Sequence, residues 1–304
     1  MSELAALIAA QAKLNLHLRV LAREDSGYHS IETIFHRIDL SDDVRIEIKA
    51  RERTLDVQGA DTGPVESNLA WKAASLYAIH NGWPSGFAIH LTKRIPMGAG
   101  LGGGSADAAA VLRLLDFLSP QPMPNAGLLS LASEIGSDVP FLATSSVMAM
   151  AWGRGERMLA LPPLPRHDVL LMSPAFSVAT RDAYDWIDDD RGSLVEANRA
   201  MGAVQRAPEA VEFDSIDLST WPGIAKFARN DFEAPVAARY PEIAEHLARL
   251  RNSRAIFSGM TGSGSTVFGI LDSPPNYAKV PEEHRERVTT TSTSIDVVQP
   301  VRVG

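Results

Sequence analysis

The feature that most constrains the fold is a glycine-rich run between a predicted strand and a predicted helix. Residues 96–106 read Pro-Met-Gly-Ala-Gly-Leu-Gly-Gly-Gly-Ser-Ala, so five of the seven positions from 98 to 104 are glycine. The preceding segment, Gly86–Leu91, has the pattern of a strand. The following segment, Ser105–Leu118, is rich in Ala and Leu without a helix breaker, which favours a buried helix. The predicted order is therefore strand, glycine loop, helix.

Such a loop presents unshielded backbone N–H groups at the start of a helix, where the helix dipole favours negative charge. Glycine also lets the backbone approach a triphosphate closely, and Ser105 adds a hydroxyl that could cap the helix or reach Mg²⁺. A simple packing turn is disfavoured, because so many glycines raise the entropy of the unfolded chain. We therefore predict that the loop binds the phosphates of ATP through Pro96, Met97, Gly98, Ala99, Gly100, Leu101, Gly102, Gly103, Gly104, Ser105 and Ala106.

Two other phosphate-binding patterns compete with this interpretation. A Walker loop is excluded, because Gly-Lys-Ser or Gly-Lys-Thr occurs nowhere in the chain. Gly98, Gly100 and Gly103 do satisfy the dinucleotide fingerprint G-x-G-x-x-G. That fingerprint requires an acidic residue about 20 positions later to hold a ribose, and this chain has the proline-rich segment 119–124 there instead. A dehydrogenase is therefore disfavoured.

Composition limits the partners and the location of the protein. The chain has 29 basic and 37 acidic residues and a formal charge of −8, which argues against a surface for nucleic acid. It has no cysteine, so disulfides and thiolate metal sites are excluded. No apolar stretch approaches the roughly 20 residues that span a bilayer, and Met1–Ala12 lacks the basic start of a signal peptide. We expect a cytoplasmic protein with no membrane or nucleic-acid partner; the sequence gives no indication of its oligomeric state.

The length of 304 residues corresponds to two domains at about 150 residues each. Prolines at positions 162, 163 and 165 suggest a boundary, and Val169–Met172 then reads as a buried strand. We predict an N-terminal ATP-binding domain over residues 1–160 and a C-terminal domain over 161–304. The acidic stretch Asp185–Asp217, which includes three consecutive aspartates at 188–190, is predicted to be a solvated helical excursion without a metal.

Two segments place polar side chains where chemistry is possible. Lys13–Val20 alternates polar and apolar residues, as a half-buried strand does, with Lys13 and Asn15 on its polar face. Asp138 follows a helix predicted to begin with a cap at Asn125 and to end before Gly136. Pro140 disfavours a helical conformation at the residue before it, so Asp138 should lie in a fixed turn as a positioned carboxylate.

Three motifs in order along the chain resemble the GHMP kinases, which are ATP-dependent kinases of small metabolites. The first motif is Ala12–Leu16, the second is the glycine loop 96–106, and the third is Ser258–Phe268, which reads Ser-Gly-Met-Thr-Gly-Ser-Gly-Ser-Thr-Val-Phe. The resemblance implies an α+β fold of two domains with the active site in the cleft between them. It also implies that Gly259, Gly262 and Gly264 of the third motif support the phosphate loop or the substrate channel.

Further segments, Ser26–His29, Ile135–Phe141 and Asn230–Val236, resemble family members that phosphorylate the 2-hydroxyl of a cytidine-diphosphate-linked polyol in non-mevalonate isoprenoid synthesis. The resemblance implies a catalytic pair, Lys13 and Asp138, with Mg²⁺ arriving together with ATP. It implies nucleotide contacts from Asn68 and Lys93. It also implies a substrate site built from Asn15, Tyr28, His29, Thr180 and Tyr184.

These roles are chemically reasonable for phosphoryl transfer. Asp138 would take the proton of the attacking hydroxyl, while Lys13 would keep that carboxylate ionised and offset charge on the moving phosphoryl group. The alternatives are an exposed strand lysine for Lys13, a helix cap for Asp138 and core packing for the aromatic residues. At the level of the whole protein, the alternatives are a GHMP kinase for homoserine, mevalonate or a sugar, and a nucleotide-binding protein without catalysis.

Overall fold

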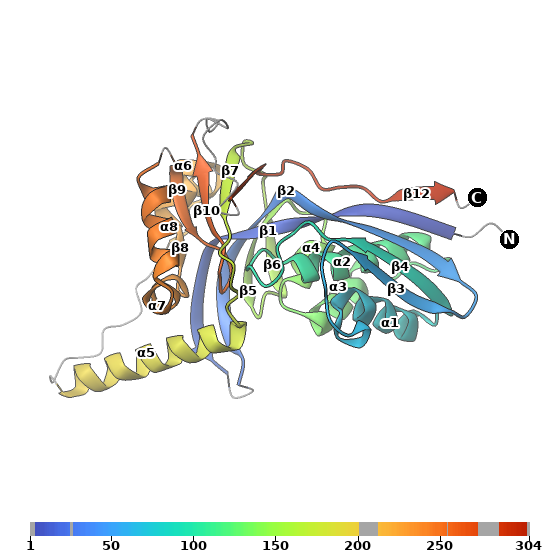
Figure 1. The fold of residues 1–304 in the computed structure, drawn as a ribbon, viewed down its shortest axis with the longest axis horizontal. Helices are drawn as coiled ribbons and strands as arrows, with labels where there is room; N and C mark the ends of the chain where they lie inside the picture. The colour runs from blue at the N-terminus through green and yellow to red at the C-terminus, as the bar shows by residue number, and fades with distance from the viewer. Residues whose placement is uncertain (1–3, 25–26, 201–211, 254, 273–285, 303–304) are drawn as a thin grey trace.

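Two β-sheets organise the computed structural model of the chain, which describes residues 4–24, 27–200, 212–253, 255–272 and 286–302 (Figure 1). The larger sheet has eight described strands, in the order β12-β1-β2-β4-β3, with β5 and β8 pairing to β2 and β1 and β6 pairing to β5. Its strands are β1 (Leu4–Arg23), β2 (His29–Lys49), β3 (Arg53–Gln58), β4 (Gly86–Thr92), β5 (Met148–Gly153), β6 (Arg157–Leu161), β8 (Arg229–Asn230) and β12 (Gln299–Arg302). The smaller sheet has the order β11-β7-β10-β9, formed by β7 (Asp168–Met172), β9 (Ala255–Met260), β10 (Val267–Leu271) and β11 (Glu286–Thr290).

Strand β1 is longer and more buried than its alternating pattern predicted. It pairs with β2 along its whole length and with β12 at its start, so the strand begins at Leu4 instead of near residue 13. The polar side chains in its middle, Gln11, Lys13, Asn15 and His17, are buried. The expected half-buried strand is wrong on this point, because the end of α6 (Trp221–Phe227) and the turn after β9 lie against these side chains. His17 Nδ1 lies 2.7 Å from the carbonyl oxygen of Phe227, and Asn15 Oδ1 accepts a hydrogen bond from the backbone N–H of Gly262.

Four helices cover one face of the larger sheet (Figure 1). They are α1 (Leu69–Asn81), α2 (Gly103–Leu118), α3 (Asn125–Ile135) and α4 (Val139–Ala143). Helix α2 follows the glycine loop, as the sequence predicted, and its small side chains are buried in the main hydrophobic core. The cap of α3 differs from the prediction, because Pro124 occupies the N-cap position and Asn125 is already helical.

Helix α4 fixes the position of Asp138. Val139 is the first helical residue, so the expectation that Pro140 would keep it out of the helix is wrong; proline is well tolerated in a first turn, where N–H groups lack helical partners. The buried Arg37 donates hydrogen bonds to the carbonyl oxygens of Phe141, Leu142 and Thr144 at the other end of α4. These bonds satisfy the terminal carbonyls of a helix too short to be stable alone.

The remaining helices pack around the smaller sheet or extend from it. They are α5 (Thr180–Ala200), α6 (Trp221–Phe227), α7 (Glu233–Arg239) and α8 (Pro241–Arg251). Helix α5 projects away from the body of the molecule, as the yellow helix in Figure 1 shows. The predicted acidic excursion begins on α5, but its residues 201–211 lie outside the described part of the chain. The proposed domain boundary near residue 160 stays a prediction, while β8 and β12 return the later part of the chain to the larger sheet.

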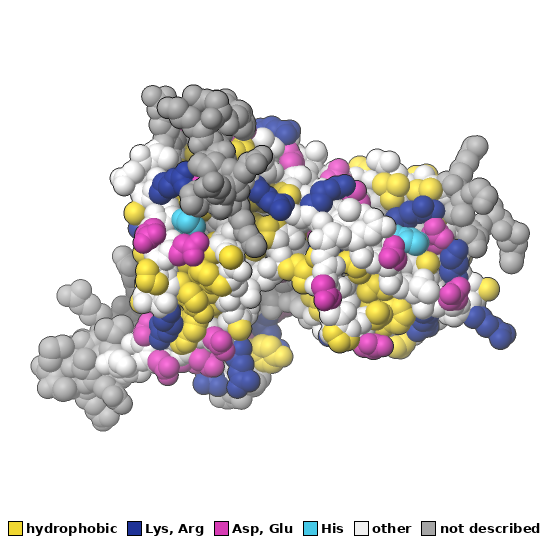
Figure 2. Space-filling model, viewed as in Figure 1, with side chains coloured by type: hydrophobic (Ala, Val, Ile, Leu, Met, Phe, Trp, Pro, Cys, Tyr) yellow, Lys and Arg dark blue, Asp and Glu magenta, His cyan; other side chains and the backbone are white. Residues whose placement is uncertain are grey.

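The surface carries charges of both signs. On the face seen in Figure 2, basic and acidic side chains are interspersed over both parts of the molecule. Within the described ranges, no helix has both the length and the apolar character required to cross a bilayer.

Candidate active site

A cavity of about 880 Å³ lies where β1, the glycine loop, the start of α5 and the turn after β9 meet. Its lining includes all but one of the site residues predicted from the sequence: Lys13, Asn15, Tyr28, His29, Asn68, Lys93, Pro96, Met97, Gly98, Ala99, Gly100, Leu101, Gly102, Gly103, Gly104, Ser105, Asp138, Thr180 and Tyr184. The exception is Ala106, whose side chain packs in the hydrophobic core. Segments distant in sequence therefore meet at one cavity.

The glycine loop needs glycine at several positions for conformational and steric reasons. Gly98, Gly100 and Gly102 have φ angles of 63°, 77° and 73°, in the left-handed region that other residues avoid. A Cβ atom on Gly100 would lie 2.1 Å from the carbonyl oxygen of Thr261, and one on Gly102 would lie 3.0 Å from the side chain of Lys13. The loop thus brings its backbone against both β1 and the third glycine motif.

The third motif contacts the phosphate loop directly. The backbone N–H of Thr266 donates to the carbonyl oxygen of Ala99 at 3.2 Å, and the hydroxyl of Thr261 donates to that of Gly100 at 3.1 Å. Gly262 and Gly264 also line the cavity. Thr261 was not identified from the sequence, because a threonine inside a glycine-rich turn gives no signal of its distant partner.

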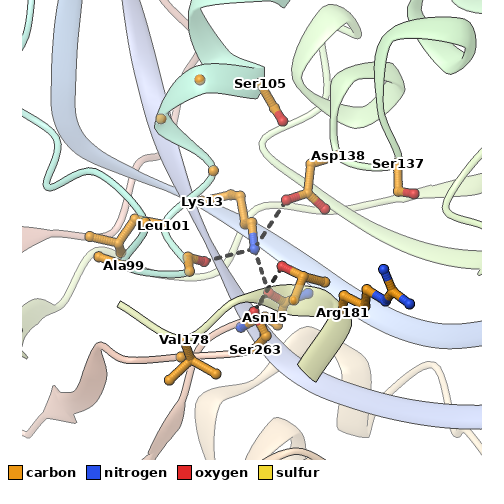
Figure 3. A pocket seen from close by; sticks show the side chains of 18 of the residues that line it. Lys13, Asn15, Ala99, Leu101, Ser105, Ser137, Asp138, Val178, Arg181 and Ser263 are labelled. Carbon is orange, nitrogen blue, oxygen red and sulfur yellow. Dashed lines mark hydrogen bonds and ion pairs between the residues drawn. The ribbon is translucent and has the colours of Figure 1, made fainter. Parts of the chain in front are cut away.

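Lys13 and Asp138 face one another across the cavity floor (Figure 3). Lys13 Nζ lies 3.3 Å from Asp138 Oδ2, and it donates hydrogen bonds to Asn15 Oδ1 at 2.6 Å and to the carbonyl oxygen of Gly100 at 2.9 Å. The lysine is buried, whereas the aspartate side chain is 28% exposed. Asp138 occupies the N-cap position of α4 but makes no capping hydrogen bond with its side chain. Its carboxylate is therefore directed to Lys13 and the cavity, not used as a helix cap.

Asn15 holds Lys13 in place through a set of buried hydrogen bonds. Its Oδ1 accepts from Lys13 Nζ and from the backbone N–H of Gly262 at 2.9 Å, and its Nδ2 donates to Thr33 Oγ1 at 2.9 Å. Because both ends of the amide are engaged, its orientation is fixed. A contact between Asn15 and the substrate stays a prediction.

Aromatic residues gather at the end of the cavity near α5. The rings of His29 and Tyr184 are stacked with centroids 4.6 Å apart, and Tyr184 packs edge-on against Phe232. Burial raises the pKa of the Tyr184 phenol to about 12, so it is neutral at physiological pH. Tyr28 is exposed, and the guanidinium of Arg154 lies 4.1 Å from its ring centroid. Ser26 of the motif at 26–29 lies outside the described residues.

Helix α5 contributes polar groups as well. Thr180 Oγ1 lies 3.1 Å from Ser263 Oγ of the third motif. Asp188 Oδ1 lies 2.9 Å from His29 Nε2. Asp189 and Asp190 are exposed, as a solvated helix predicts, but Asp188 is not; its contact with a ring 159 positions earlier could not be identified from local charge.

The two predicted nucleotide contacts have structural partners of their own. Asn68 caps α1 by accepting a hydrogen bond from the N–H of Ala70 at 2.9 Å. Lys93 is buried between the carboxylates of Asp42 and Asp107. Asp42 also accepts hydrogen bonds from backbone N–H groups of the segment that leads into the glycine loop. Both residues line the cavity, and their contacts with a nucleotide stay predictions.

The cluster formed by Asp42, Lys93 and Asp107 contains one ammonium and two carboxylates. Burial raises the pKa of Asp107 to about 7, although Lys93 opposes this shift; the nearby Asp42 carboxylate adds to it. Burial disfavours the charge on Lys93, but the two carboxylates outweigh that effect and raise its pKa. The ammonium is therefore retained, while Asp107 takes up a proton in the pH range around neutrality.

This shift predicts a pH-dependent stability. Unfolded Asp107 should release its proton near pH 4, whereas the native carboxyl retains it up to about pH 7. Between these two pH values the native state binds more protons than the unfolded state. The contribution of Asp107 to the free energy of unfolding is therefore complete below about pH 4 and is lost as the pH rises through 7. Asparagine cannot titrate, so the free energy of unfolding of Asp107→Asn should not show this decrease with rising pH. Urea unfolding of both proteins from pH 4 to pH 8.5 measures the difference, and parallel pH profiles would contradict it.

Comparison with known proteins agrees with this arrangement. The chain matches "GHMP kinases N terminal domain" over residues 68–153 and "GHMP kinases C terminal" over residues 213–288. It is 36% identical over 291 residues to a 4-diphosphocytidyl-2-C-methyl-D-erythritol kinase of Pelotomaculum thermopropionicum, covering 93% of this chain and 96% of that protein.

Solved structures agree as well. A crystal structure of 4-(cytidine 5'-diphospho)-2C-methyl-D-erythritol kinase is 34% identical, with a TM-score of 0.70 and coverage of 94% of this chain and 98% of that chain. A homoserine kinase from Cytophaga hutchinsonii, 16% identical with a TM-score of 0.66, covers 99% of this chain and 98% of that chain and shares the fold. The α+β fold expected from the three motifs is confirmed. The chain belongs to the GHMP kinase family.

Proposed function

We propose that the protein is an ATP-dependent kinase that phosphorylates the 2-hydroxyl of 4-diphosphocytidyl-2-C-methyl-D-erythritol, a step in non-mevalonate isoprenoid precursor synthesis. Relatives named for this activity, at 36% and 34% identity, support the proposal. The observation that carries it is the placement of the Lys13–Asp138 pair, with Nζ and Oδ2 3.3 Å apart, between the glycine loop and the aromatic end of the cavity. ATP and the substrate hydroxyl would thus meet beside a general base, Asp138, and a cation, the ammonium of Lys13.

In this proposal Asp138 is the general base. The substrate hydroxyl loses its proton to the Asp138 carboxylate, its oxygen forms a bond to the γ-phosphorus of ATP, and the bond from that phosphorus to the bridging oxygen of ADP breaks. Lys13 pairs with the Asp138 carboxylate and stabilises the negative charge on the transferring phosphoryl group. Asn15 and the carbonyl of Gly100 hold the ammonium in position.

The glycine loop would bind the triphosphate through its backbone N–H groups and the N-terminus of α2. No group of three or more metal-ligating His, Asp or Glu side chains occurs among the described residues. Mg²⁺ often needs only one or two protein oxygens and otherwise binds phosphate and water. Ser105, which lines the cavity in the first turn of α2, supplies such an oxygen and fits an ion that arrives with ATP. Bound there, Mg²⁺ would neutralise phosphate charge.

The substrate would occupy the end of the cavity near α5. Tyr28, His29 and Tyr184 offer aromatic faces for the cytosine ring, and ring nitrogens and hydroxyls for its polar edge. Thr180 and Asn15 line the path from this end to Lys13 and would contact the rest of the substrate. Asn68 and Lys93 line the nucleotide side of the loop. The proposal implies a small-molecule partner and, as the sequence predicts, a cytoplasmic reaction.

A substrate panel tests the proposal. With labelled ATP and Mg²⁺, we expect phosphoryl transfer to the cytidylyl polyol and no comparable transfer to homoserine, mevalonate or sugars, because the aromatic end of the cavity offers stacking faces for a nucleobase. Preferred transfer to homoserine or mevalonate would overturn the proposed substrate. Calorimetry in the same buffer distinguishes the remaining alternative: ATP binding without transfer to any acceptor would indicate a non-catalytic nucleotide-binding protein.

A further inference from the structure

Helix α5 presents one face of its first half to the cavity. Thr180, Tyr184 and Asp188 are spaced by four residues, so their side chains lie on the same side of the helix. Two of these residues contact the same ring: Tyr184 stacks on His29, and the Asp188 carboxylate meets the edge of that ring. The orientation of His29 is therefore set by the helix.

The contact between His29 and Asp188 determines where the ring carries its proton. His29 Nε2 lies 2.9 Å from Oδ1 and 3.1 Å from Oδ2 of Asp188. A carboxylate only accepts hydrogen bonds, so the proton lies on Nε2. In the neutral imidazole, Nδ1 then carries a lone pair. Nδ1 has no hydrogen-bond partner among the described residues, and the ring lines the cavity.

Other contacts hold α5 against the strand that leads to His29. Arg191, one turn beyond Asp188, donates a hydrogen bond to the carbonyl oxygen of Val20 and lies 3.2 Å from Asp231 Oδ2. Arg23 Nη1 lies 3.4 Å from Asp188 Oδ2. Asp188 is thus docked at the end of β1 and is only 30% exposed, while its neighbours Asp189 and Asp190 face solvent.

We propose that Asp188 is a positioning residue for base specificity: it fixes the Nε2–H tautomer of His29, so that Nδ1 is an acceptor for the exocyclic amino group of the substrate's cytosine. The inference rests on the function proposed above. Where cytosine has an amino group, uracil has a carbonyl oxygen. His29 Nδ1 as an acceptor would bind the amino group of cytosine. With uracil, two acceptors, Nδ1 and the carbonyl oxygen, would face one another. The pair would therefore select a cytidylyl over a uridylyl substrate.

Replacing Asp188 by Ala tests this role, with Asp189→Ala and Asp190→Ala as matched controls from the same acidic run. The readout is the ratio of kcat/KM for the cytidylyl polyol to that for its uridine-diphosphate analogue. We expect this ratio to fall about tenfold in Asp188→Ala, the worth of one hydrogen bond, through KM for the substrate with KM for ATP unchanged. Asp188→Asn keeps an acceptor oxygen and should recover most of the ratio. Both controls should match the wild type.

A double-mutant cycle separates this role from simple docking of α5. Because Asp188 acts through His29, adding Asp188→Ala to His29→Ala should not change the ratio further. If Asp188→Ala lowers the ratio in the His29→Ala background as much as it does alone, the inference is overturned. Nitrogen NMR of the wild-type ring above pH 8 gives a direct measurement: a protonated Nε2 is expected, and a protonated Nδ1 would overturn the proposal even if a variant failed to fold. The two proposals fail differently, since no transfer by the wild type would refute the function, whereas normal transfer with an unchanged ratio in Asp188→Ala would refute only the role of Asp188.

Discussion

Replacing Asp138 by Asn is expected to lower kcat by about 10²–10⁴-fold, the usual contribution of a general base, with little change in KM for ATP. The amide has the size of the carboxylate but cannot accept the proton of the attacking hydroxyl. The ATP-binding loop should be unaffected, because Lys13 Nζ keeps its hydrogen bonds to Asn15 and to the carbonyl oxygen of Gly100. Single-turnover kinetics with labelled ATP measures the chemical step directly.

The fold should tolerate this substitution, which makes the kinetic result interpretable. Asp138 makes no capping hydrogen bond, and α4 is anchored at its other end by Arg37. The kcat of Lys13→Met should fall by a comparable factor. The kcat of the double variant should be little lower than that of either single variant, since the two groups act on one proton transfer. Activity like that of the wild type in Asp138→Asn would contradict its role as base. If the fold-decrease in kcat of the double variant equals the product of the two single decreases, the two residues act independently.

The location of the glycine loop and its helix could be predicted from sequence because local rules determine them. Glycine at the alternate left-handed positions 98, 100 and 102, followed by a helix-forming run, favours the loop and α2 through local conformation, before the contacts of the loop with distant residues are considered. The three ordered motifs also predicted the fold of the whole chain. The convergence of Lys13 and Asp138 was predicted through that resemblance, although no local pattern brings residues so far apart within 3.3 Å.

The burial of the polar face of β1 could not be predicted from alternation. Period two shows only that the two faces differ, and a polar face usually meets solvent. Here that face meets backbone carbonyls and the amide of Gly262, so its side chains find hydrogen-bond partners inside the protein. Asp188 and Arg37 were missed for a related reason. One lies in an acidic run that locally reads as solvated, and the other acquires its role from carbonyls more than a hundred positions away.

Lys93 has the largest expected effect on stability. Its ammonium is buried between the carboxylates of Asp42 and Asp107, and Asp42 is fully buried. Lys93→Met keeps much of the side-chain volume but leaves the buried carboxyl groups of Asp42 and Asp107 together without a cation. We expect the free energy of unfolding at pH 7 to fall by about 3–5 kcal/mol, the usual cost of removing one partner of a buried ion pair. Lys72→Met, on the exposed side of α1, is a matched control and should change it by less than about 0.5 kcal/mol.

A second variant distinguishes a structural counter-ion from a nucleotide contact. Lys93 holds the pKa of Asp107 down, so without it the Asp107 carboxyl takes up a proton near neutrality and Asp42 is left as the unpaired charge. If charge in the cluster causes the loss, adding Asp107→Asn to Lys93→Met should change the free energy of unfolding little at pH 7 and restore part of it in urea unfolding at higher pH, where Asp107 would ionise. Asp42 would then retain its hydrogen bonds from the backbone N–H groups before the glycine loop, which keeps the loop anchored. The opposite result is equally clear. Wild-type stability in Lys93→Met combined with a raised KM for ATP would show that Lys93 serves the nucleotide, because a buried counter-ion cannot be removed without cost to the fold.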